Sequence, residues 1–147
     1  MQRTSFANFK CPAARALDSA GDWWSMMILR DAFHGLTRFD EFQKSLGIAP
    51  NILTRRLAAL TADGLLEKRR YSERPPRDEY VLTAKGRDFL PILAAIGAWG
   101  SKHHGEGGTT RIVDAENGER VEAVVVDRAT GRPLGEFRTR LVLPDGA

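Results

Sequence analysis

The apolar residues between Pro50 and Gly64 recur at helical spacing. Leu53, Leu57 and Leu60 stand at positions i, i+4 and i+7, which places them in one row along one face of a helix. Pro50 suits the first helical position because no hydrogen bond needs its missing N–H there, and Gly64 suits the residue just past the helix end. The pattern predicts an amphipathic helix over 50–63 that turns its leucine row toward a core.

The opposite face of this helix carries hydrogen-bonding side chains near the N-terminus and small alanines behind them. Asn51 and Arg55 lie opposite the leucines, with Thr54 on one flank and Arg56 also nearer the flank. A helix in the DNA major groove presents its N-terminal residues to base edges, where Arg binds guanine and Asn binds adenine. An ordinary amphipathic helix with a polar solvent face shows the same pattern, so the neighbouring elements decide between the two interpretations.

Two helical patterns, over 23–33 and 40–46, precede the helix with the leucine row, and an earlier one opens at Pro12. Asp40 with Gln43 three residues later resembles a pair that caps a helix N-terminus. A glycine then ends this short helix, and a tight connection leads into the next one. Two short helices joined in this way are typical of a helix-turn-helix.

Two strands are predicted directly after this motif, over 65–71 and 78–82, and Pro75-Pro76 places a loop between them. Residues 68–77 hold one acid, Glu73, and five basic side chains, which are Lys68, Arg69, Arg70, Arg74 and Arg77. A β-hairpin with a basic tip after a helix-turn-helix is a wing that holds DNA phosphates without reading sequence. A solvated charged loop is the alternative, and the preceding motif favours the wing.

A long helix is predicted over 84–104, with Thr83 as its N-cap and a kink at Pro91. It is so apolar that we expect it to bury surface against another subunit, together with the helix that opens at Pro12. The predicted dimer interface comprises Leu17, Phe89, Leu93, Ile96 and Trp99. Twofold symmetry would then place two recognition helices about one DNA turn (~34 Å) apart.

Residues 105–147 change character to β. Asn117-Gly118 is a hairpin signal, and strands are predicted over 110–115, 119–127 and 134–143. Three short strands are marginal alone, so we expect them to pack on the preceding domain or on a partner subunit. The predicted fold is mainly α with small β: a winged helix-turn-helix domain over 1–104 with a long dimerisation helix, then a linker and a C-terminal three-stranded β appendage over 105–147.

Charge and cysteine content agree with an interaction with DNA. The net charge is +3 and the pI about 9.3; residues 1–104 hold 16 basic and 11 acidic side chains, and residues 105–147 hold 6 and 8. A basic front half suits binding of a polyanion. Cys11 is the single cysteine, and the N-terminus shows no signal-peptide pattern. The longest apolar stretch, residues 89–99, includes Pro91 and is too short to span a membrane. We expect a cytoplasmic protein.

Several ordered motifs between Cys11 and Gly100 resemble the HxlR-type subfamily of MarR-like winged helix-turn-helix transcription regulators. They read CPAARALDSAGDWWSMMILRDAFHG, RFDEF, IAPNILTRRLAALTADGLLEKRRY and PPRDEYVLTAKGRDFLPILAAIGAWG. The resemblance implies a homodimer that binds operator DNA, often as a repressor. It also implies that 50–63 is the recognition helix and 67–78 the wing.

In several members of this subfamily a cysteine at the place of Cys11 senses oxidants or electrophiles. A sensor needs an accessible thiol with a lowered pKa, to which Lys10 and Arg15 could contribute, whereas the alternative is a small buried residue near the dimer interface. The tail resembles an extension with zinc-ribbon knuckles. The knuckle glycines remain but the cysteines do not, so a cysteine zinc site is excluded and we expect no metal and no cofactor.

The sequence favours a homodimeric, sequence-specific DNA-binding transcription regulator, a repressor released by a small effector or an oxidant. Asn51, Thr54, Arg55 and Arg56 would read bases, and the five basic wing residues would hold phosphates. The alternative is a winged-helix ligand-binding or protein-interaction module that no longer binds DNA. An enzyme is not expected, since no triad, phosphate loop or metalloprotease motif occurs. The operator, the regulated genes, the sign of regulation, the effector and the role of 105–147 stay undetermined at this stage.

Overall fold

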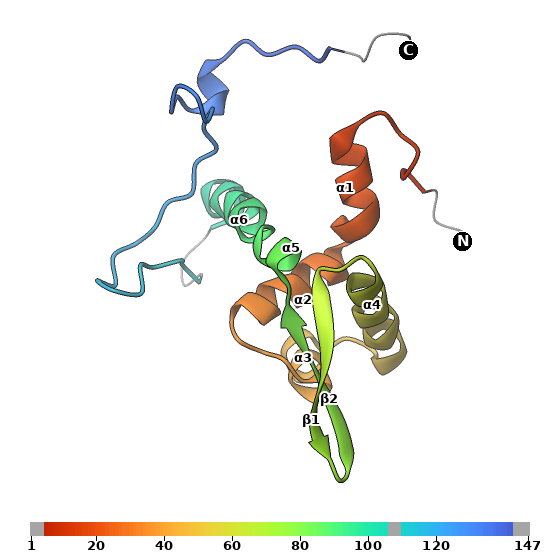
Figure 1. Cartoon of the computed structure of the whole chain (residues 1–147). Coiled ribbons are helices and arrows are strands. Elements are labelled where there is room, and N and C mark those ends of the chain that lie inside the picture. The colour runs from red at the N-terminus through yellow and green to blue at the C-terminus, as the bar shows by residue number, and fades with distance from the viewer. Residues whose placement is uncertain (1–4, 106–109, 143–147) are drawn as a thin grey trace. The chain divides into compact units, whose positions relative to one another are not determined.

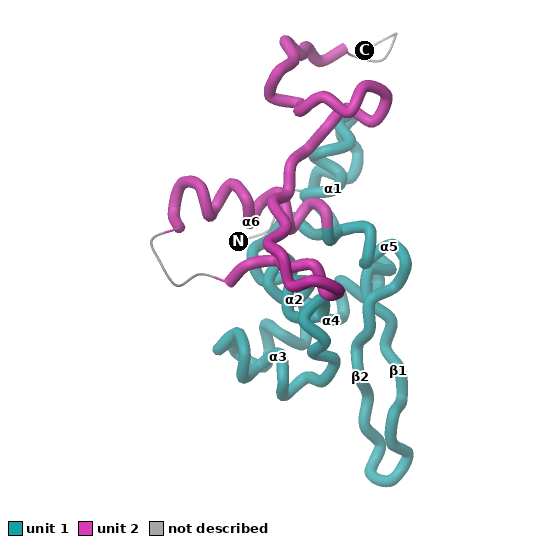
Figure 2. The backbone as a smooth tube through the Cα atoms, turned by 90° about the vertical axis from the view of Figure 1, so that its left-hand side faces the viewer, with its two compact units in different colours: residues 1–90 teal, residues 91–147 magenta. Residues whose placement is uncertain are grey.

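The computed structural model describes residues 5–105 and 110–142, and the chain forms two compact units, residues 1–90 and 91–147 (Figures 1 and 2). The first unit holds α1 (Pro12–Ala20), α2 (Trp23–Phe33), α3 (Phe39–Leu46), α4 (Pro50–Ala62), β1 (Leu66–Glu73), β2 (Pro76–Leu82) and α5 (Ala84–Arg87). Helix α6 (Leu90–His104) starts at the boundary, and a 3-10 turn, η1 (Leu134–Glu136), follows. This order confirms a mainly helical chain with a small sheet. The domain boundary expected at 104/105 stays a prediction.

The three leucines of α4 lie in the core of the first unit. Leu53, Leu57 and Leu60 are fully buried, as their spacing predicts. The other large aliphatic and aromatic side chains that are fully buried come from α2, α3 and β1, and they are Ile28, Leu29, Phe42 and Leu66. Gly64, with a φ of +73°, follows the end of α4 and turns the chain toward β1. The helix therefore presents its other face to solvent.

Helix α3 begins one residue earlier than the sequence pattern predicts, and its cap differs accordingly. The expected pair of Asp40 and Gln43 is not the one that forms. The Glu41 carboxylate accepts hydrogen bonds from the N–H groups of Arg38 and Thr37, each at 2.9 Å. These two bonds, the one from Arg38 foremost, lower the pKa of Glu41. With the earlier start, Glu41 occupies the third helical position, from which a carboxylate reaches back to the cap.

β1 and β2 form an antiparallel hairpin that projects from the helices of the first unit (Figures 1 and 2). The strands are longer than predicted, because pairing continues until Glu73 lies opposite Pro76. Only Arg74 and Pro75 remain as the turn. Pro76 was expected in a loop, yet a proline is tolerated as the first residue of a strand because its missing N–H need not join the ladder there.

The long helix predicted over 84–104 is divided into α5 and α6, so a long dimerisation helix is not confirmed. The Thr83 hydroxyl caps α5 by accepting a hydrogen bond from the Gly86 N–H at 3.0 Å. Helix α5 ends at Arg87, and Pro91 lies in the first turn of α6. Helical hydrogen bonds do not use the N–H groups of a first turn, so the proline fits there, whereas inside one continuous helix it would remove a bond. The proline thus follows a helix break rather than a kink.

Residues 110–142, called the tail below, form two tight turns, and the three-stranded appendage is not confirmed. Pairing within this described segment consists of two isolated bridges, Val113 with Arg120 and Val126 with Pro133. The third predicted strand, 134–143, holds η1 instead, and its last residue lies outside the described residues. Such short pairings need packing against other elements to extend into strands.

Candidate nucleic-acid interface

The solvent face of α4 carries the residues that the sequence pattern predicts. Asn51, Thr54 and Arg55 are exposed. Behind them lie Ala58 and Ala62, whose small side chains leave room for another molecule to approach the helix closely. The Thr54 hydroxyl donates to the carbonyl oxygen of Pro50 at 2.9 Å, which holds this side chain against the helix. The side chain of Arg55 forms no hydrogen bond or ion pair with any described residue. Its guanidinium is therefore available to a ligand at no cost in internal contacts.

Arg56, expected to read bases from the flank, has a partner inside the chain. Its Nε lies 3.3 Å from Oδ1 of Asp22, and the side chain is 33% exposed. Asp22 at the same time caps α2, since its carboxylate accepts a hydrogen bond from the Ser25 N–H at 3.1 Å. One carboxylate thus joins the start of α2 to the middle of α4. Arg56 is placed to set the position of α4 against α2.

Three of the five predicted wing cations pair with carboxylates of the hairpin itself. The Nε of Arg70 lies 2.7 Å from one oxygen of Asp78, and the Nζ of Lys68 lies 3.3 Å from the other. The Nε of Arg69 lies 3.0 Å from the carboxylate of Glu67. The hydrogen bond from Arg70 lowers the pKa of Asp78 and raises that of Arg70. Lys68 and Arg70 thus link β1 to β2, whereas the pair of Arg69 lies within β1, and the charge of all three cations is partly neutralised.

The remaining two wing cations, Arg74 and Arg77, lie at the tip of the hairpin. Both are exposed, and neither forms an ion pair with a residue of the described ranges. Glu73, next to Arg74, has a loose pair with Arg70 at 3.7 Å, and Asp78, next to Arg77, pairs with Lys68 and Arg70. The positive charge that is free to meet a phosphate is therefore concentrated at the tip.

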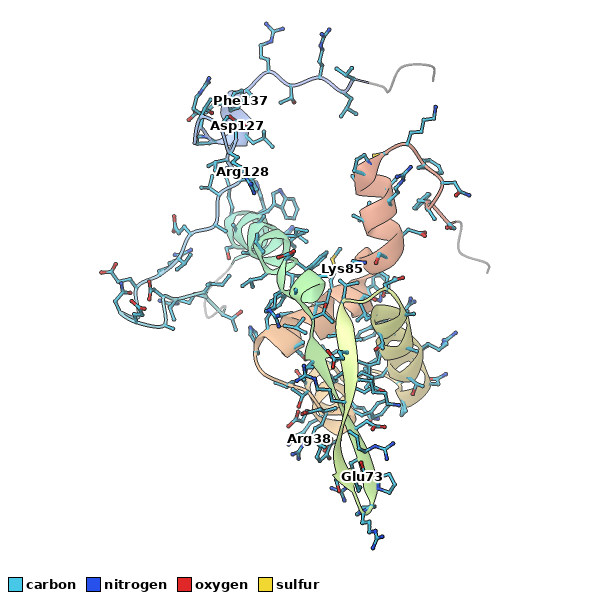
Figure 3. All side chains as sticks on the ribbon, in the orientation of Figure 1. Arg38, Glu73, Lys85, Asp127, Arg128 and Phe137 are labelled. Atoms are coloured by element: carbon cyan, nitrogen blue, oxygen red, sulfur yellow. The ribbon has the colours of Figure 1, made fainter. Side chains whose placement is uncertain are left out.

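Arg38 joins this surface, although sequence analysis assigned it no role. Its guanidinium carbon lies 4.6 Å from the centre of the Tyr71 ring, a cation–π geometry, and Figure 3 shows it beside the hairpin. The strand register shifts between Arg70 and the residue after Tyr71, so the tyrosine sits at a bulge. The spacing of Arg38 in the sequence gives no sign of this contact, because it depends on the hairpin folding back toward α3.

A family model described as HxlR-like helix-turn-helix matches residues 20–107 of this chain. The chain belongs to the HxlR-like helix-turn-helix family. Among its relatives, the HTH-type transcriptional regulator Rv3095 of Mycobacterium tuberculosis is 35% identical, over 86% of this chain and 88% of the relative. The HxlR-like chain is thus a transcription regulator with a helix-turn-helix fold, and the resemblance seen in its sequence is confirmed.

Solved structures agree with this assignment of the HxlR-like chain. The crystal structure of PA1607, a proposed transcription factor, is 44% identical with a TM-score of 0.85, and the match covers 95% of this chain and 99% of that one. The redox regulator HypR in its reduced form is 33% identical with a TM-score of 0.59, over 63% of this chain and 92% of HypR. The likeness to PA1607 covers nearly the whole chain, whereas the likeness to HypR covers less of it.

Cys11 of the HxlR-like chain lies at the N-cap of α1 and is exposed. The single chain does not bury this thiol, and burial near a dimer interface stays the alternative to a sensor. Arg15, considered as a group that could assist the thiol, donates from its Nε to the carbonyl oxygen of Phe9 at 2.6 Å. The accessibility that a sensor requires is present, and its reactivity stays a prediction.

The residues predicted to form the dimer interface of the HxlR-like chain are largely uncovered. Leu17, Ile96 and Trp99 are between 46% and 60% exposed, and Phe89 and Leu93 are half-buried. The Trp99 ring contacts two histidine rings of α6, those of His103 and His104, with centres 5.1 and 5.3 Å away.

Among residues 5–105 and 110–142, no helix has the length and apolar character of a membrane span. The same ranges contain no cluster of three or more His, Cys, Asp or Glu residues arranged for a metal ion.

Proposed function

We propose that this HxlR-like regulator is a homodimer that binds double-stranded DNA in a sequence-specific manner through α4 and the hairpin. We propose further that it acts as a repressor released by a small effector or by an oxidant. The observation that carries the proposal is the exposed N-terminal face of α4, with an unpaired Arg55, in the same unit as a hairpin whose tip cations are also unpaired. This is the arrangement that reading base edges and holding phosphates requires.

Base reading is assigned to Asn51, Thr54 and Arg55. Arg55 has the free guanidinium that a bidentate contact with guanine needs, and the Asn51 amide can bind adenine once its oxygen leaves the Ile52 N–H. Arg56 was predicted to read bases as well. Because its guanidinium pairs with Asp22, we assign it the positioning of α4, with base contact only at the flank.

Phosphate binding is assigned first to Arg74 and Arg77, which have no internal partner among the described residues. Lys68, Arg69 and Arg70 would contribute less, because a phosphate must compete with the carboxylates that already hold them. Contacts of this kind release counterions from DNA, so the affinity should fall steeply with salt.

The homodimer would use exposed and half-buried apolar residues of α1, of α6 and of the turn before α6, which are Leu17, Phe89, Leu93, Ile96 and Trp99. HypR is named a redox regulator and is similar to this chain over 92% of its own length, which supports an oxidant as the releasing signal. Cys11, exposed at the N-cap of α1, is the candidate residue for it. With no second cysteine in the chain, its oxidation would lead to a disulfide between subunits or with a small thiol.

The test is a fluorescence-anisotropy titration of the full chain against the DNA upstream of its own gene, at two salt concentrations and with scrambled competitor. Saturable binding that outcompetes scrambled DNA and weakens with salt is the expected result. Binding no tighter than to scrambled DNA, even at low salt, would favour the alternative of a winged-helix module for ligand or protein binding. Adding a thiol oxidant to the complex then tests release, with Cys11→Ser as the variant that should stay bound.

A further inference from the structure

Arg38 stands at the start of the first helix of the helix-turn-helix and carries an uncompensated positive charge. It is the N-cap residue of α3, and its side chain is exposed. Within residues 5–105 and 110–142, its guanidinium forms no ion pair and donates no hydrogen bond. It contacts the ring of Tyr71, 4.6 Å from the ring centre. A cation–π contact needs no acceptor atom, so the N–H donors of Arg38 stay available to a ligand.

Tyr71 lies at an irregularity of β1 that takes it out of the strand pairing. The register passes from Arg70 to Ser72 and skips Tyr71, which is the extra residue of a bulge. A bulge redirects a side chain that would otherwise follow the alternation of the strand. The Tyr71 ring is 38% exposed and lies against the guanidinium of Arg38. The hairpin thus gives the arginine a support.

The backbone next to Arg38 is fixed by the other strand of the hairpin. The Tyr80 N–H, from β2, donates to the carbonyl oxygen of Thr37 at 2.7 Å. Residues 37 and 38 are therefore tied to β2 through the backbone and to β1 through the Tyr71 ring. A group that is already held in place loses less conformational entropy when it binds a ligand.

The start of α3 offers the guanidinium of Arg38, and not its backbone N–H groups, to an anion. The Glu41 carboxylate already accepts hydrogen bonds from the N–H groups of Thr37 and Arg38, each at 2.9 Å. Both N–H groups thus have an acceptor inside the chain. An anion that approaches the start of α3 would have to be bound by the side chain.

Arg38 lies on the same side of the first unit as the other unpaired cations of the interface. Figure 3 shows it beside the half of the hairpin that ends near Glu73, next to the turn. Arg74 and Arg77, which have no carboxylate partner in the described ranges, belong to that turn and the strand after it. Helix α4 ends at the base of the hairpin, so its first residues lie toward the side of the turn (Figure 1).

We infer that Arg38, supported by the Tyr71 ring, binds a DNA phosphate in addition to the phosphates held by the hairpin tip. The inference rests on the proposed function and deepens it, because it adds a contact from the first helix of the motif. The planar guanidinium of an arginine can hold a phosphate through two parallel N–H donors. Phosphate contacts fix the orientation of a protein on the duplex. A phosphate on Arg38 would thus help to orient α4 in the groove.

The first test compares Arg38→Ala with the native full-length chain in anisotropy titrations at several salt concentrations. The DNA upstream of its own gene and scrambled DNA are both titrated. The substitution should weaken binding to both by about tenfold, the value of one charge-assisted hydrogen bond. The slope of log affinity against log salt should become shallower by about one, with the preference between the two DNAs unchanged. An unchanged slope would overturn the inference.

Matched variants separate the charge of Arg38 from its support. Arg38→Lys keeps the charge and should retain the native slope, although it binds more weakly without the planar fork. Tyr71→Leu removes the cation–π contact and should weaken binding about threefold without changing the slope. Lys10→Ala removes an exposed charge just before α1, at the other end of the unit from the hairpin turn (Figure 1), and should change the affinity less than about twofold. Equal effects of Lys10→Ala and Arg38→Ala would show a general charge effect and contradict the contact.

Uncharged phosphates locate the contact on the DNA. Operator duplexes, each with one phosphate replaced by a methylphosphonate, are titrated with the native chain and with Arg38→Ala. At one position the replacement should weaken binding of the native chain but not of Arg38→Ala, because the variant has already lost that contact. Arg74→Ala should become insensitive at a different phosphate. If no phosphate behaves in this way for Arg38, the inference is wrong.

The same titrations distinguish a failure of this inference from a failure of the proposed function. If the native chain binds both DNAs equally while Arg38→Ala still has the shallower slope, sequence-specific binding fails and the phosphate contact stands. If the native chain prefers its own upstream DNA and Arg38→Ala titrates like it, the proposed function stands and the inference fails. A native chain that binds neither DNA at low salt overturns both.

Discussion

Helix α4 and the tail both contain large aliphatic residues, but α4 buries its leucines and the tail leaves its aliphatic residues exposed. The three leucines of α4 are fully buried, whereas the valines and leucines of the tail lie open to solvent. The difference comes from spacing and from neighbours. In α4 the leucines gather on one helical face and are buried together with side chains of α2 and α3, whereas in the tail Val124, Val125 and Val126 follow one another in sequence and are all exposed.

This comparison teaches that apolar content alone does not make a core. A residue contributes to the stability of the chain only when another element of the same chain covers it, at roughly 25 cal/mol per Å² of apolar area removed from water. The first unit meets this condition through three short helices and a hairpin. The tail does not, so its apolar residues are available for association.

The largest expected difference between the two regions is in stability. Leu57→Ala should lower the free energy of unfolding by about 2–5 kcal/mol, because it leaves a cavity in the core. Val125→Ala should lower it by less than about 0.5 kcal/mol in the single chain, since the valine is already half exposed. Urea unfolding at several protein concentrations distinguishes the two, because a loss through subunit docking depends on concentration. Equal losses at every concentration would contradict the comparison.

Two glycines extend the comparison of the first unit with the tail to backbone packing. A Cβ on Gly86 would collide with the carbonyl oxygen of Leu65, where α5 packs closely on the start of the hairpin. Gly86→Ala should therefore destabilise the chain by about 1–3 kcal/mol. Gly135 in the tail has open space around its Cβ position and an ordinary φ, so Gly135→Ala should stay within about 0.5 kcal/mol of the native chain. Thermal unfolding of the two variants side by side gives the measurement.

Two arginines, one in each region, allow the same comparison for DNA affinity. Arg55→Ala should weaken binding by about 1–3 kcal/mol and relax the preference at one base position. Arg128→Ala removes an exposed arginine from the tail and should leave the affinity unchanged. Anisotropy titrations against a panel of single-base operator variants measure both effects. An unchanged affinity for Arg55→Ala would mean that another face of the first unit reads the bases.

The smallest expected effect concerns two carboxylates, Asp78 and Asp127, whose pKa values are lowered by different partners. The hydrogen bond from Arg70 lowers the pKa of Asp78, whereas the Thr130 hydroxyl lowers that of Asp127. In both cases the stabilising contribution is present above the ordinary pKa of 3.8 and disappears as the pH falls through the lower folded-state pKa.

The dependence of the pKa on salt distinguishes the two carboxylates. At high salt the pKa of Asp78 should rise toward its ordinary value because its ion pair is screened, while the pKa of Asp127 should stay lowered by neutral donors. Carboxyl carbon shifts recorded by NMR during an acid titration report each residue separately. Equal salt responses would show that Asp78 is not held by Arg70 and Lys68 in solution.

The fold of the first unit was predictable to a large extent because its signals are local. The leucine row of α4 and Gly64 after α4 both stand where the sequence places them. The errors occurred where two local rules competed. Glu41 caps α3, Pro76 is the first residue of β2, and the helix predicted over 84–104 is interrupted before Pro91. In each case the packing of neighbouring elements decided where the helix or strand begins or ends.

The candidate site was predictable in its residue types but not in their pairing. Sequence placed Arg55 and Arg56 side by side as readers of bases, and only the structure shows that Arg56 pairs with Asp22. An ion pair between residues so distant in sequence leaves no periodic pattern. The same holds for Arg38 and Tyr71, which meet because the hairpin folds toward α3.

The sequence by itself determined the helix-turn-helix, its exposed polar face and the basic hairpin, because helical period, caps and turn residues act within a few positions. It determined equally that the tail holds no cysteine for a zinc site. Only the tertiary structure decided which wing cations are free, which arginine positions α4, and which apolar rows find cover. Those outcomes depend on distances between residues far apart in the chain, since whether an aliphatic row becomes a core or a binding surface depends on what else the fold brings to it.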